Sequence, residues 1–296
     1  MKCKLCGSEN MHCVFEGPIR NGTVGVYTKD SQQIFHCDDC GTYWHKDLHE
    51  HDKSFYESEE YRKEIEGSSE VGNFYRLYDK KQYLYLEWLT NVPLRGKVVA
   101  DVGCAGGSLL DYIKGLAKQT ISIEPSRTYQ QALREKGHIV FSYQDEALEI
   151  YRGQVDVITS FDVIEHVQDP VNFICQQYEL LAPGGVMVVG TPTDYPNIRS
   201  IIAEEFSSFL FSVQHPWIFE ERGLRYMAKK AGFAQDSIII RQKQRFGLSN
   251  LLSWALYRQP RGDAPYPFFS SAIEDAYRRE QETAGRGDYI LLYAKK

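Results

Sequence analysis

A buried strand that runs straight into a glycine-rich turn constrains the fold of this chain more than any other feature. Residues 98–107 read Val-Val-Ala-Asp-Val-Gly-Cys-Ala-Gly-Gly, so an apolar run leads into Asp101 and then into glycines. Glycine lets the backbone approach a ligand closely and adopts positive φ without steric cost. Apolar residues follow at helical spacing from Leu109 to Leu116, so we expect the turn to open a helix that packs on a sheet.

A second predicted strand, residues 120–124, ends in Glu124. A carboxylate at the end of such a strand can accept hydrogen bonds from both hydroxyls of a ribose. The dinucleotide fingerprint G-x-G-x-x-G would need glycine where Ala105 and Ser108 stand, so a nicotinamide or flavin site is disfavoured. No Gly-Lys-Ser or Gly-Lys-Thr follows the turn, which argues against a phosphate-binding loop.

Four sequence blocks together resemble the class I S-adenosylmethionine-dependent methyltransferases. The first is Asp101-Val-Gly-Cys-Ala-Gly-Gly, and the others are residues 124–126, 155–170 and 180–192, in the order that the family shows. The resemblance implies an α/β fold, a Rossmann-like, doubly wound, seven-stranded sheet whose last strand is antiparallel. The strands are expected near residues 97–102, 119–124, 139–143, 155–161, 185–191, 237–241 and 288–294.

The same resemblance implies a site for S-adenosylmethionine. Its expected contacts are Asp101, Gly103, Cys104, Gly107, Glu124, Pro125, Gln144, Asp145 and Phe161. Gln144 and Asp145 would contact the adenine amino group, or else they only cap the next helix, since Asp is a favoured cap. Cys104 is expected to pack beside the cofactor and not to act as a nucleophile. Many similar proteins carry glycine in place of Ala105, so we expect an ordinary backbone conformation at this alanine.

Two histidines are the candidate catalytic residues. His166 follows the fourth strand, where the acceptor is expected to enter, and His215 precedes Pro216 and Trp217. An imidazole titrates near neutral pH and can accept the proton of a hydroxyl group. The alternative is that either histidine orients a loop by hydrogen bonding, because the Glu-His pair of similar proteins often serves positioning.

Four cysteines form two Cys-x-x-Cys pairs, Cys3 with Cys6 and Cys37 with Cys40, and each pair is followed directly by glycine. Four thiolates in a tetrahedron favour structural zinc, and iron in the same site stays open. We therefore predict an N-terminal zinc ribbon. The residues between the two pairs would form a hairpin with Asn21-Gly22 at its turn.

Charge and hydropathy limit the classes of partner. The formal net charge of −6 argues against a broad electrostatic surface for nucleic acid. The chain contains no apolar run long enough to span a membrane, and no apolar segment follows the basic N-terminus as in a secretory signal. We therefore expect a cytoplasmic protein without a membrane span.

Three parts are predicted along the chain: a zinc ribbon over 1–48, a helical linker or lid over 49–95, and a methyltransferase domain over 96–296. The aromatic residues of the middle part would cover the cofactor and acceptor as a lid or, as we prefer, pack the ribbon against the main domain. They are Tyr56, Tyr61, Tyr75, Tyr78, Tyr83, Tyr85 and Trp88. Residues 247–287 form an insertion between the last two strands, expected to be a wall of the acceptor pocket or a homodimer contact.

The resemblance and the motifs together predict S-adenosylmethionine-dependent methyl transfer to a small-molecule or saccharide acceptor, with oxygen as the methylated atom. One alternative is an RNA methyltransferase that uses the ribbon to bind RNA. The segment 29–53 disfavours it, because acidic residues outnumber lysines there. A second alternative is a binding module without catalysis. The intact glycine turn and Glu124 argue against this, because an adenosyl ligand needs them.

Overall fold

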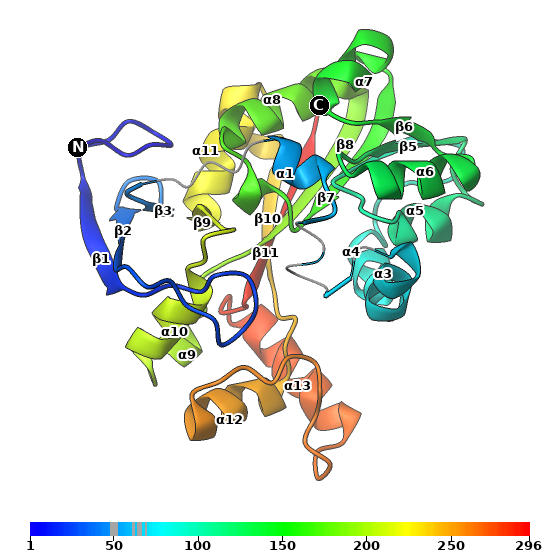
Figure 1. Cartoon of the computed structure of the whole chain (residues 1–296). Helices are drawn as coiled ribbons and strands as arrows, with labels where there is room; N and C mark the ends of the chain where they lie inside the picture. Colours follow the sequence, from blue (N-terminus) through cyan, green and yellow to red (C-terminus); the bar gives the residue numbers. More distant parts are fainter. Residues whose placement is uncertain (48–52, 61–62, 64–66, 69) are drawn as a thin grey trace.

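A computed structural model describes residues 1–47, 53–60, 63, 67–68 and 70–296 of the chain (Figure 1). Tyr61 of the predicted aromatic group and residues 48–52, at the predicted limit between the ribbon and the helical linker, lie outside the described residues. The described elements form two β-sheets, a small one near the N-terminus and a large one in the centre of the molecule.

The large sheet has seven strands in the order β10-β11-β8-β7-β4-β5-β6. The strands are β4 (Val98–Val102), β5 (Gln119–Ile123), β6 (Ile139–Phe141), β7 (Val155–Phe161), β8 (Leu181–Pro192), β10 (Ile238–Lys243) and β11 (Tyr289–Lys295). Strands β4 to β8 pair in parallel, whereas β11 is antiparallel to both β8 and β10. This confirms the predicted doubly wound sheet with an antiparallel last strand.

Helices cover both faces of this sheet because successive strand residues point to opposite sides. On β4, Ala100 contacts the core under α7 (Gln144–Tyr151), α8 (Pro170–Leu180) and α11 (Glu221–Ala231). The neighbouring Val99 faces the opposite core. That second core lies under α3 (Val71–Tyr78), α5 (Ser108–Ile113) and α6 (Arg127–Glu135). The predicted cofactor site therefore lies at the end of a central strand whose two faces are both packed against helices.

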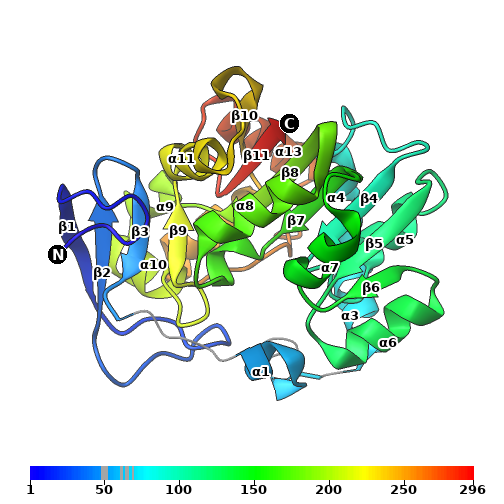
Figure 2. The same ribbon diagram turned by 90° about the horizontal axis from the view of Figure 1, so that it is seen from above.

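The small sheet is made of the N-terminal segment and one strand from far along the chain. Its order is β1 (Met11–Gly17), β2 (Gln32–Cys37), β3 (Thr42–His45) and β9 (Trp217–Phe219), all antiparallel (Figure 2). Asn21-Gly22 lies within a longer loop between β1 and β2, where the Asn21 amide donates to the Val26 carbonyl at 2.9 Å. The predicted domain limits stay predictions, but β9 ties residues 217–219 to the N-terminal part.

The aromatic segment forms α1 (Lys53–Glu57), α3, the 3-10 turn η1 (Asp79–Lys81) and α4 (Gln82–Trp88). Rings of α4 contact the main sheet, whereas Phe74 of α3 contacts Tyr129 of α6. Tyr85 stacks on Phe161 at 4.6 Å, and Trp88 stacks on Tyr289 at 5.1 Å between ring centroids. These contacts place α4 over the end of β7, and the lid and packing interpretations of the segment both stay predictions.

The insertion forms α12 (Leu248–Tyr257) and α13 (Ser271–Thr283), which project at the bottom of the view in Figure 1. Trp254 is its anchor, because the indole packs edge-on against Phe206 and Phe209 of α10 (Ala203–Leu210). The remaining short elements are α9 (Pro196–Arg199) and the 3-10 turns η2 (Ile164–His166) and η3 (Gln235–Ser237). No helix among the described residues combines the length and the apolar character needed to cross a bilayer.

Candidate functional site

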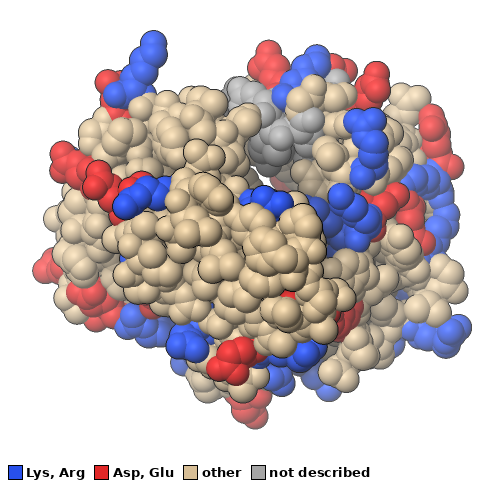
Figure 3. All heavy atoms as spheres, turned by 90° about the horizontal axis from the view of Figure 1, so that it is seen from below, with Lys and Arg blue, Asp and Glu red and all other residues tan. Residues whose placement is uncertain are grey.

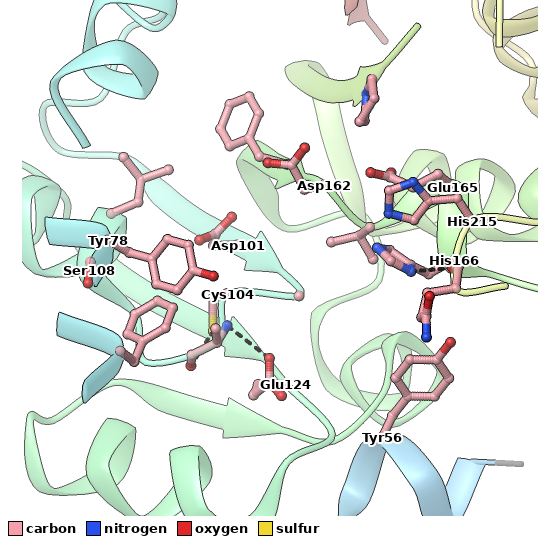
Figure 4. A pocket seen from close by; sticks show the side chains of 18 of the residues that line it. Tyr56, Tyr78, Asp101, Cys104, Ser108, Glu124, Asp162, Glu165, His166 and His215 are labelled. Carbon is pink, nitrogen blue, oxygen red and sulfur yellow. Dashed lines mark hydrogen bonds between the residues drawn. The ribbon is translucent and has the colours of Figure 1, made fainter. Parts of the chain in front are cut away.

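A cavity of about 560 Å³ opens at the carboxyl ends of β4, β5 and β7, where ligands bind in parallel α/β sheets (Figure 4). One side of it is formed by the glycine-rich turn, Asp101 and Glu124. The other side is formed by Glu165, His166 and His215. Residues of α1, α3 and α4 complete the wall. The cavity therefore has one end with a glycine-rich turn and two carboxyl groups, and another end with a carboxyl group and two imidazoles.

Six of the predicted cofactor contacts line this cavity. They are Asp101, Gly103, Cys104, Glu124, Pro125 and Phe161. Gly107, Gln144 and Asp145 are not among the described lining residues. Gln144 is buried and donates from Nε2 to Oε1 of Gln176 at 3.2 Å, and Asp145 accepts from the Glu146 amide at 3.1 Å. The contact with adenine that we expected of Gln144 and Asp145 therefore stays a prediction.

Glu124 sits directly after β5 with its carboxylate buried beside the turn. One oxygen accepts a hydrogen bond from the Ala105 amide at 2.8 Å, and the other accepts from the Ser126 amide at 2.9 Å. Each carboxylate oxygen has two lone pairs, so both can accept a further hydrogen bond from a ligand hydroxyl. The same side chain can thus order the turn and hold a ribose.

Asp101, near the end of β4, is 5% exposed. Its Oδ1 accepts from the Thr159 hydroxyl at 2.7 Å. Burial, together with the charge of Glu124, raises the pKa of Asp101 from 3.8 to about 7. Two buried acidic groups that face one cavity are stabilised by a ligand with positive charge. S-adenosylmethionine carries such a charge on its sulfonium and amino groups, so these residues fit it.

The turn departs from one expectation. Ala105 has φ +48°, in the left-handed region, and not the ordinary conformation that we predicted. The reason is tertiary: the Ala105 amide must point at Glu124 to donate its hydrogen bond. Gly103 and Gly107 also have positive φ, +73° and +78°. A Cβ on them would meet Val163 and Leu133, respectively, so these glycines serve close packing within the protein.

Both predicted histidines reach the opposite end of the cavity. His166, in η2, donates from Nδ1 to the main-chain carbonyl of Gln214 at 2.6 Å. The ring of His215 lies edge-on to that of His166 at 4.7 Å between centroids. Desolvation, the neighbouring His166 and Arg20 hold the pKa of His215 well below 6.5, so its imidazole is neutral.

Glu165 is a member of this group that our sequence analysis did not select. Its carboxyl is 1% exposed and accepts from the Thr191 hydroxyl at 2.9 Å. Burial and the charge of Asp162 raise its pKa to about 8. The adjacent His166 was the available signal, since Glu-His at the end of a strand brings two titratable groups to one loop.

Asp162 and Arg245 form an ion pair between the two ends. Nη1 of Arg245 lies 2.9 Å from Asp162 Oδ1, and the Tyr85 hydroxyl donates to Oδ2 at 3.2 Å. The guanidinium also lies over the ring of Tyr289, 4.1 Å from its centroid. Arg245 follows β10, so no local pattern connects it with residue 162.

A loop of the N-terminal part closes one side of the cavity. Arg20, Gly22, Thr23 and Val24 are lining residues. The Gly22 amide donates to the side-chain carbonyl of Gln214 at 2.9 Å, next to the carbonyl that holds His166. None of residues 247–287, which are all described, lines the cavity. The role of the insertion as a pocket wall is therefore not supported, and a homodimer contact stays a prediction.

The four predicted metal ligands converge. The sulfur atoms of Cys3, Cys6, Cys37 and Cys40 all lie within 4.8 Å of one another. Two of the Sγ–Sγ distances, Cys3 to Cys40 and Cys6 to Cys37, are 3.6 Å. Tetrahedral zinc with Zn–S bonds of about 2.3 Å requires sulfur atoms about 3.8 Å apart. The donor set and its spacing therefore fit a structural zinc ion.

Comparison with known proteins agrees with this arrangement. A family described as "Methyltransferase domain" matches residues 74–238, more than half of the chain. A ubiquinone biosynthesis O-methyltransferase of Thiobacillus denitrificans is 34% identical over 117 residues, which are 36% of this chain and 50% of that protein. The protein of the same name from Albidiferax ferrireducens is 31% identical over 134 residues, 42% of this chain and 53% of its own. The chain thus spans about half the length of the curated relatives that it matches.

A solved structure shares the fold. It is a chain of the complex between the Haloferax volcanii Trm112 methyltransferase activator and a methyltransferase. Its TM-score is 0.50 at 16% identity, covering 76% of this chain and 93% of that one. With the strand order and the family match, this establishes the class. The chain belongs to the methyltransferase domain family and has the fold of the class I S-adenosylmethionine-dependent methyltransferases.

Proposed function

We propose that the chain transfers the methyl group of S-adenosylmethionine to an oxygen of a small-molecule acceptor, with saccharides among the candidate acceptors. One observation carries the proposal: a single cavity joins the motif residues Asp101 and Glu124 to the pair His166 and His215. The named relatives are O-methyltransferases, which supports oxygen as the methylated atom.

Residues on one side of the cavity would hold the cofactor, which supplies a methyl group on a positively charged sulfur. Glu124 would accept hydrogen bonds from the ribose hydroxyls, and Asp101 would balance the positive charge. Phe161 and Cys104 would pack against the cofactor. This assignment places the reacting carbon toward the histidine end, so the acceptor would enter between the ribbon loop and η2.

His166 and His215 would activate the acceptor hydroxyl. The neutral ring of His215 has a nitrogen lone pair at this end of the cavity, where the ring of His166 lies edge-on to it, and a hydroxyl acceptor needs its proton removed as the new bond forms. Tyr56, Tyr78 and Tyr85 line the same cavity, so the helices that carry them would exclude water as a lid.

The surface supports a small acceptor over RNA. On the face shown in Figure 3, acidic and basic residues are interspersed around a broad uncharged area, and no continuous basic face is visible. All seven cysteines are free of disulfides, as is usual in a reducing compartment. On this ground we retain the prediction of a cytoplasmic location.

Calorimetry followed by a turnover assay tests the proposal. The purified chain should bind S-adenosylmethionine, and it should form S-adenosylhomocysteine with members of a panel of phenols, catechols and sugars. Glu124→Ala should weaken cofactor binding, since each lost hydrogen bond to a charged group costs about 1.5 to 3 kcal/mol. Gln131→Ala, an exposed change on α6, should leave binding unchanged. Turnover with transfer or ribosomal RNA but with no small molecule would contradict the proposal, and binding without any turnover would favour a non-catalytic module.

A further inference from the structure

Two donor side chains, at the end of the cavity that His166 and His215 line, are held by the main chain of one residue, Gly22. The guanidinium of Arg20 donates from Nη1 to the Gly22 carbonyl at 3.2 Å. The Gly22 amide donates to Oε1 of Gln214 at 2.9 Å. Arg20 and Gln214 are therefore neighbours, and both line the cavity.

Arg20 brings a positive charge to this end of the cavity. Its Nε and Nη1 donate to the main-chain carbonyls of Phe209 and Gly22, and the guanidinium lies 5.2 Å from the centroid of the Phe209 ring. Within the described part of the chain, no carboxylate pairs with this guanidinium and its Nη2 makes no hydrogen bond. Burial lowers the pKa of Arg20, as expected for a charge without a charged partner.

Gln214 adds neutral donors beside this charge. Its Oε1 accepts from the Gly22 amide and from the Ser212 hydroxyl at 2.7 Å, which distinguishes the oxygen from the nitrogen of the side chain. Nε2 therefore carries two N–H groups, and these make no hydrogen bond with a described residue. Because Gln214 is buried and lines the cavity, a ligand in the cavity would satisfy them.

We propose that Arg20 and Gln214 bind an anionic group of the acceptor, either a carboxylate or a phosphate. This inference rests on the proposed function and names its class of acceptor. Guanidinium groups form charge-assisted hydrogen bonds with carboxylates and phosphates, and such bonds are stronger than those between neutral groups. An acidic acceptor would pair the charge of Arg20 and satisfy the side-chain amide of Gln214 at once.

The neighbouring charged groups leave this role to Arg20. Arg245 also lines the cavity, but its guanidinium is paired with Asp162 at 2.9 Å. Glu165 has a pKa of about 8, raised by burial and by Asp162. Its carboxyl is therefore largely protonated at neutral pH and does not cancel the charge of Arg20.

The position of Arg20 favours the acceptor over the carboxylate of the cofactor. The cofactor is expected beside Asp101 and Glu124, which lie at the opposite end of the cavity (Figure 4). Burial, His166 and Arg20 together lower the pKa of His215, so the guanidinium acts on the histidine end. An anion held by Arg20 would place the acceptor beside the two imidazoles.

Calorimetry with matched acidic and neutral compounds tests the site on the full chain with S-adenosylhomocysteine bound. The pairs are glucuronate with glucuronamide, protocatechuate with its amide, and glucose phosphate with glucose. The acidic member should bind about 10-fold to 100-fold more tightly, because it adds hydrogen bonds between charged groups. A preference in the first two pairs alone would identify a carboxylate as the anionic group, and a preference in the third pair alone would identify a phosphate.

Gln214→Glu is the most informative variant. The new carboxylate can still accept from the Gly22 amide and the Ser212 hydroxyl, but it would pair with Arg20 in place of the acceptor, so the preference for acidic compounds should vanish. Arg20→Gln should reduce the ratio of the two affinities to about one, whereas Arg20→Lys keeps the charge and should retain part of the preference. Arg279→Gln, an exposed change on α13 outside the cavity, is the matched control and should leave the ratio unchanged.

The ratio of affinities separates recognition of the anion from a structural role, because a distorted cavity would lose both members of a pair alike. Three results would overturn the proposal. They are equal or absent binding of the two members of every pair by the parent chain, full preference in folded Arg20→Gln and Gln214→Glu variants, and a weaker Kd for S-adenosylmethionine in Arg20→Gln with the preference unchanged. The last result would assign Arg20 to the carboxylate of the cofactor.

Failure of the proposed function gives a different pattern. In that case the acidic compounds would still bind in preference to their neutral partners, while no acceptor would be methylated. Methyl transfer to neutral and acidic acceptors with equal kcat/KM would leave the proposed function standing and would contradict the anion site.

Discussion

The imidazole of His166 and the main chain of Gln214 are joined by a hydrogen bond of 2.6 Å from Nδ1 to the carbonyl oxygen. The side chain of the same glutamine accepts from the Gly22 amide at 2.9 Å and from the Ser212 hydroxyl at 2.7 Å. Gln214 is 4% exposed. One buried residue therefore links the N-terminal loop to the end of the cavity that His166 lines.

Replacing this link should affect the acceptor more than the cofactor. Gln214→Ala leaves the Gly22 amide without its acceptor, at a cost of about 1 to 3 kcal/mol of unfolding free energy. We expect a higher KM for the acceptor and an unchanged Kd for S-adenosylmethionine, measured by steady-state kinetics and calorimetry. Gln33→Ala is the control, since its side-chain bonds to Glu16 and Lys46 are exposed and its loss should change stability by less than about 0.5 kcal/mol. An equal change in the KM for the acceptor and in the Kd for S-adenosylmethionine would contradict this expectation.

Ala105→Gly should stabilise the protein slightly. A side chain in the left-handed region costs about 1 to 2 kcal/mol, and glycine removes this cost. Glycine also destabilises the folded state by roughly 0.5 to 1 kcal/mol, because it loses more conformational entropy on folding than alanine does. We expect the free energy of unfolding, measured by urea denaturation, to rise by up to about 1.5 kcal/mol. Ala132→Gly, in the regular helix α6, should instead lose about 1 kcal/mol. The same loss at both positions would show that Ala105 is unstrained.

The affinity for the cofactor should rise with pH because of Asp101. A positively charged ligand favours the carboxylate, and in the free protein that group has a pKa of about 7. We expect binding to strengthen from about pH 5 to about pH 7 and then to level off. Calorimetry in buffers of different ionisation enthalpy should show the release of a proton below about pH 7. Asp101→Asn should bind more weakly and without this pH dependence.

The same residue should lower the stability of the free protein at high pH. The pKa of Asp101 is raised above the value of 3.8, so the folded form binds the proton more tightly than the unfolded chain does. Its stabilising contribution is complete below about pH 4 and is lost as the pH rises through about 7. Asp101→Asn should therefore raise Tm relative to the parent at pH 8 more than at pH 4. A constant difference in Tm would contradict the raised pKa.

Loss of a ribbon cysteine should reach the acceptor end of the cavity. Cys37→Ser removes one of four ligands, and we expect loss of the metal ion, a lower Tm and weaker acceptor binding, because the loop at Gly22 connects β1 with β2. Metal analysis and thermal unfolding measure these effects. A colourless parent protein that contains the metal would indicate zinc and not iron. Cys13→Ser is the control, since Cys13 is exposed and outside the metal group. Full activity in the metal-free Cys37→Ser variant would show that acceptor binding does not depend on the ribbon.

The central fold could be predicted because its signals are local. The apolar runs at β4, β5 and β7 mark buried parallel strands, and Asp101 and Glu124 stand where such strands end. The carboxyl ends of neighbouring parallel strands meet at one edge, so the sequence alone brings these two residues together. The metal site could be predicted for a similar reason, because each Cys-x-x-Cys pair is a local motif that brings two sulfur atoms together.

The rest of the site depends on contacts between distant segments. Arg245 pairs with Asp162, and residues 20–24 reach the cavity, through the path of the whole chain and not through any local pattern. The conformation at Ala105 was predicted wrongly, because a hydrogen bond to Glu124 outweighs the intrinsic preference of alanine. The three-residue strand β9 is too short for a periodic signal.

The pairing of β3 with β9 makes the N-terminal part inseparable from the rest of the molecule. A fragment that began at the main sheet would leave β9 with an uncovered edge and would bare Trp217, Ile218 and Phe219, which are at most 2% exposed in the intact chain. Such a truncation invites aggregation, and the ribbon cannot be transplanted as an independent module. An exchange of acceptor preference between relatives would therefore require the N-terminal part and the segment that contains β9 to be exchanged together.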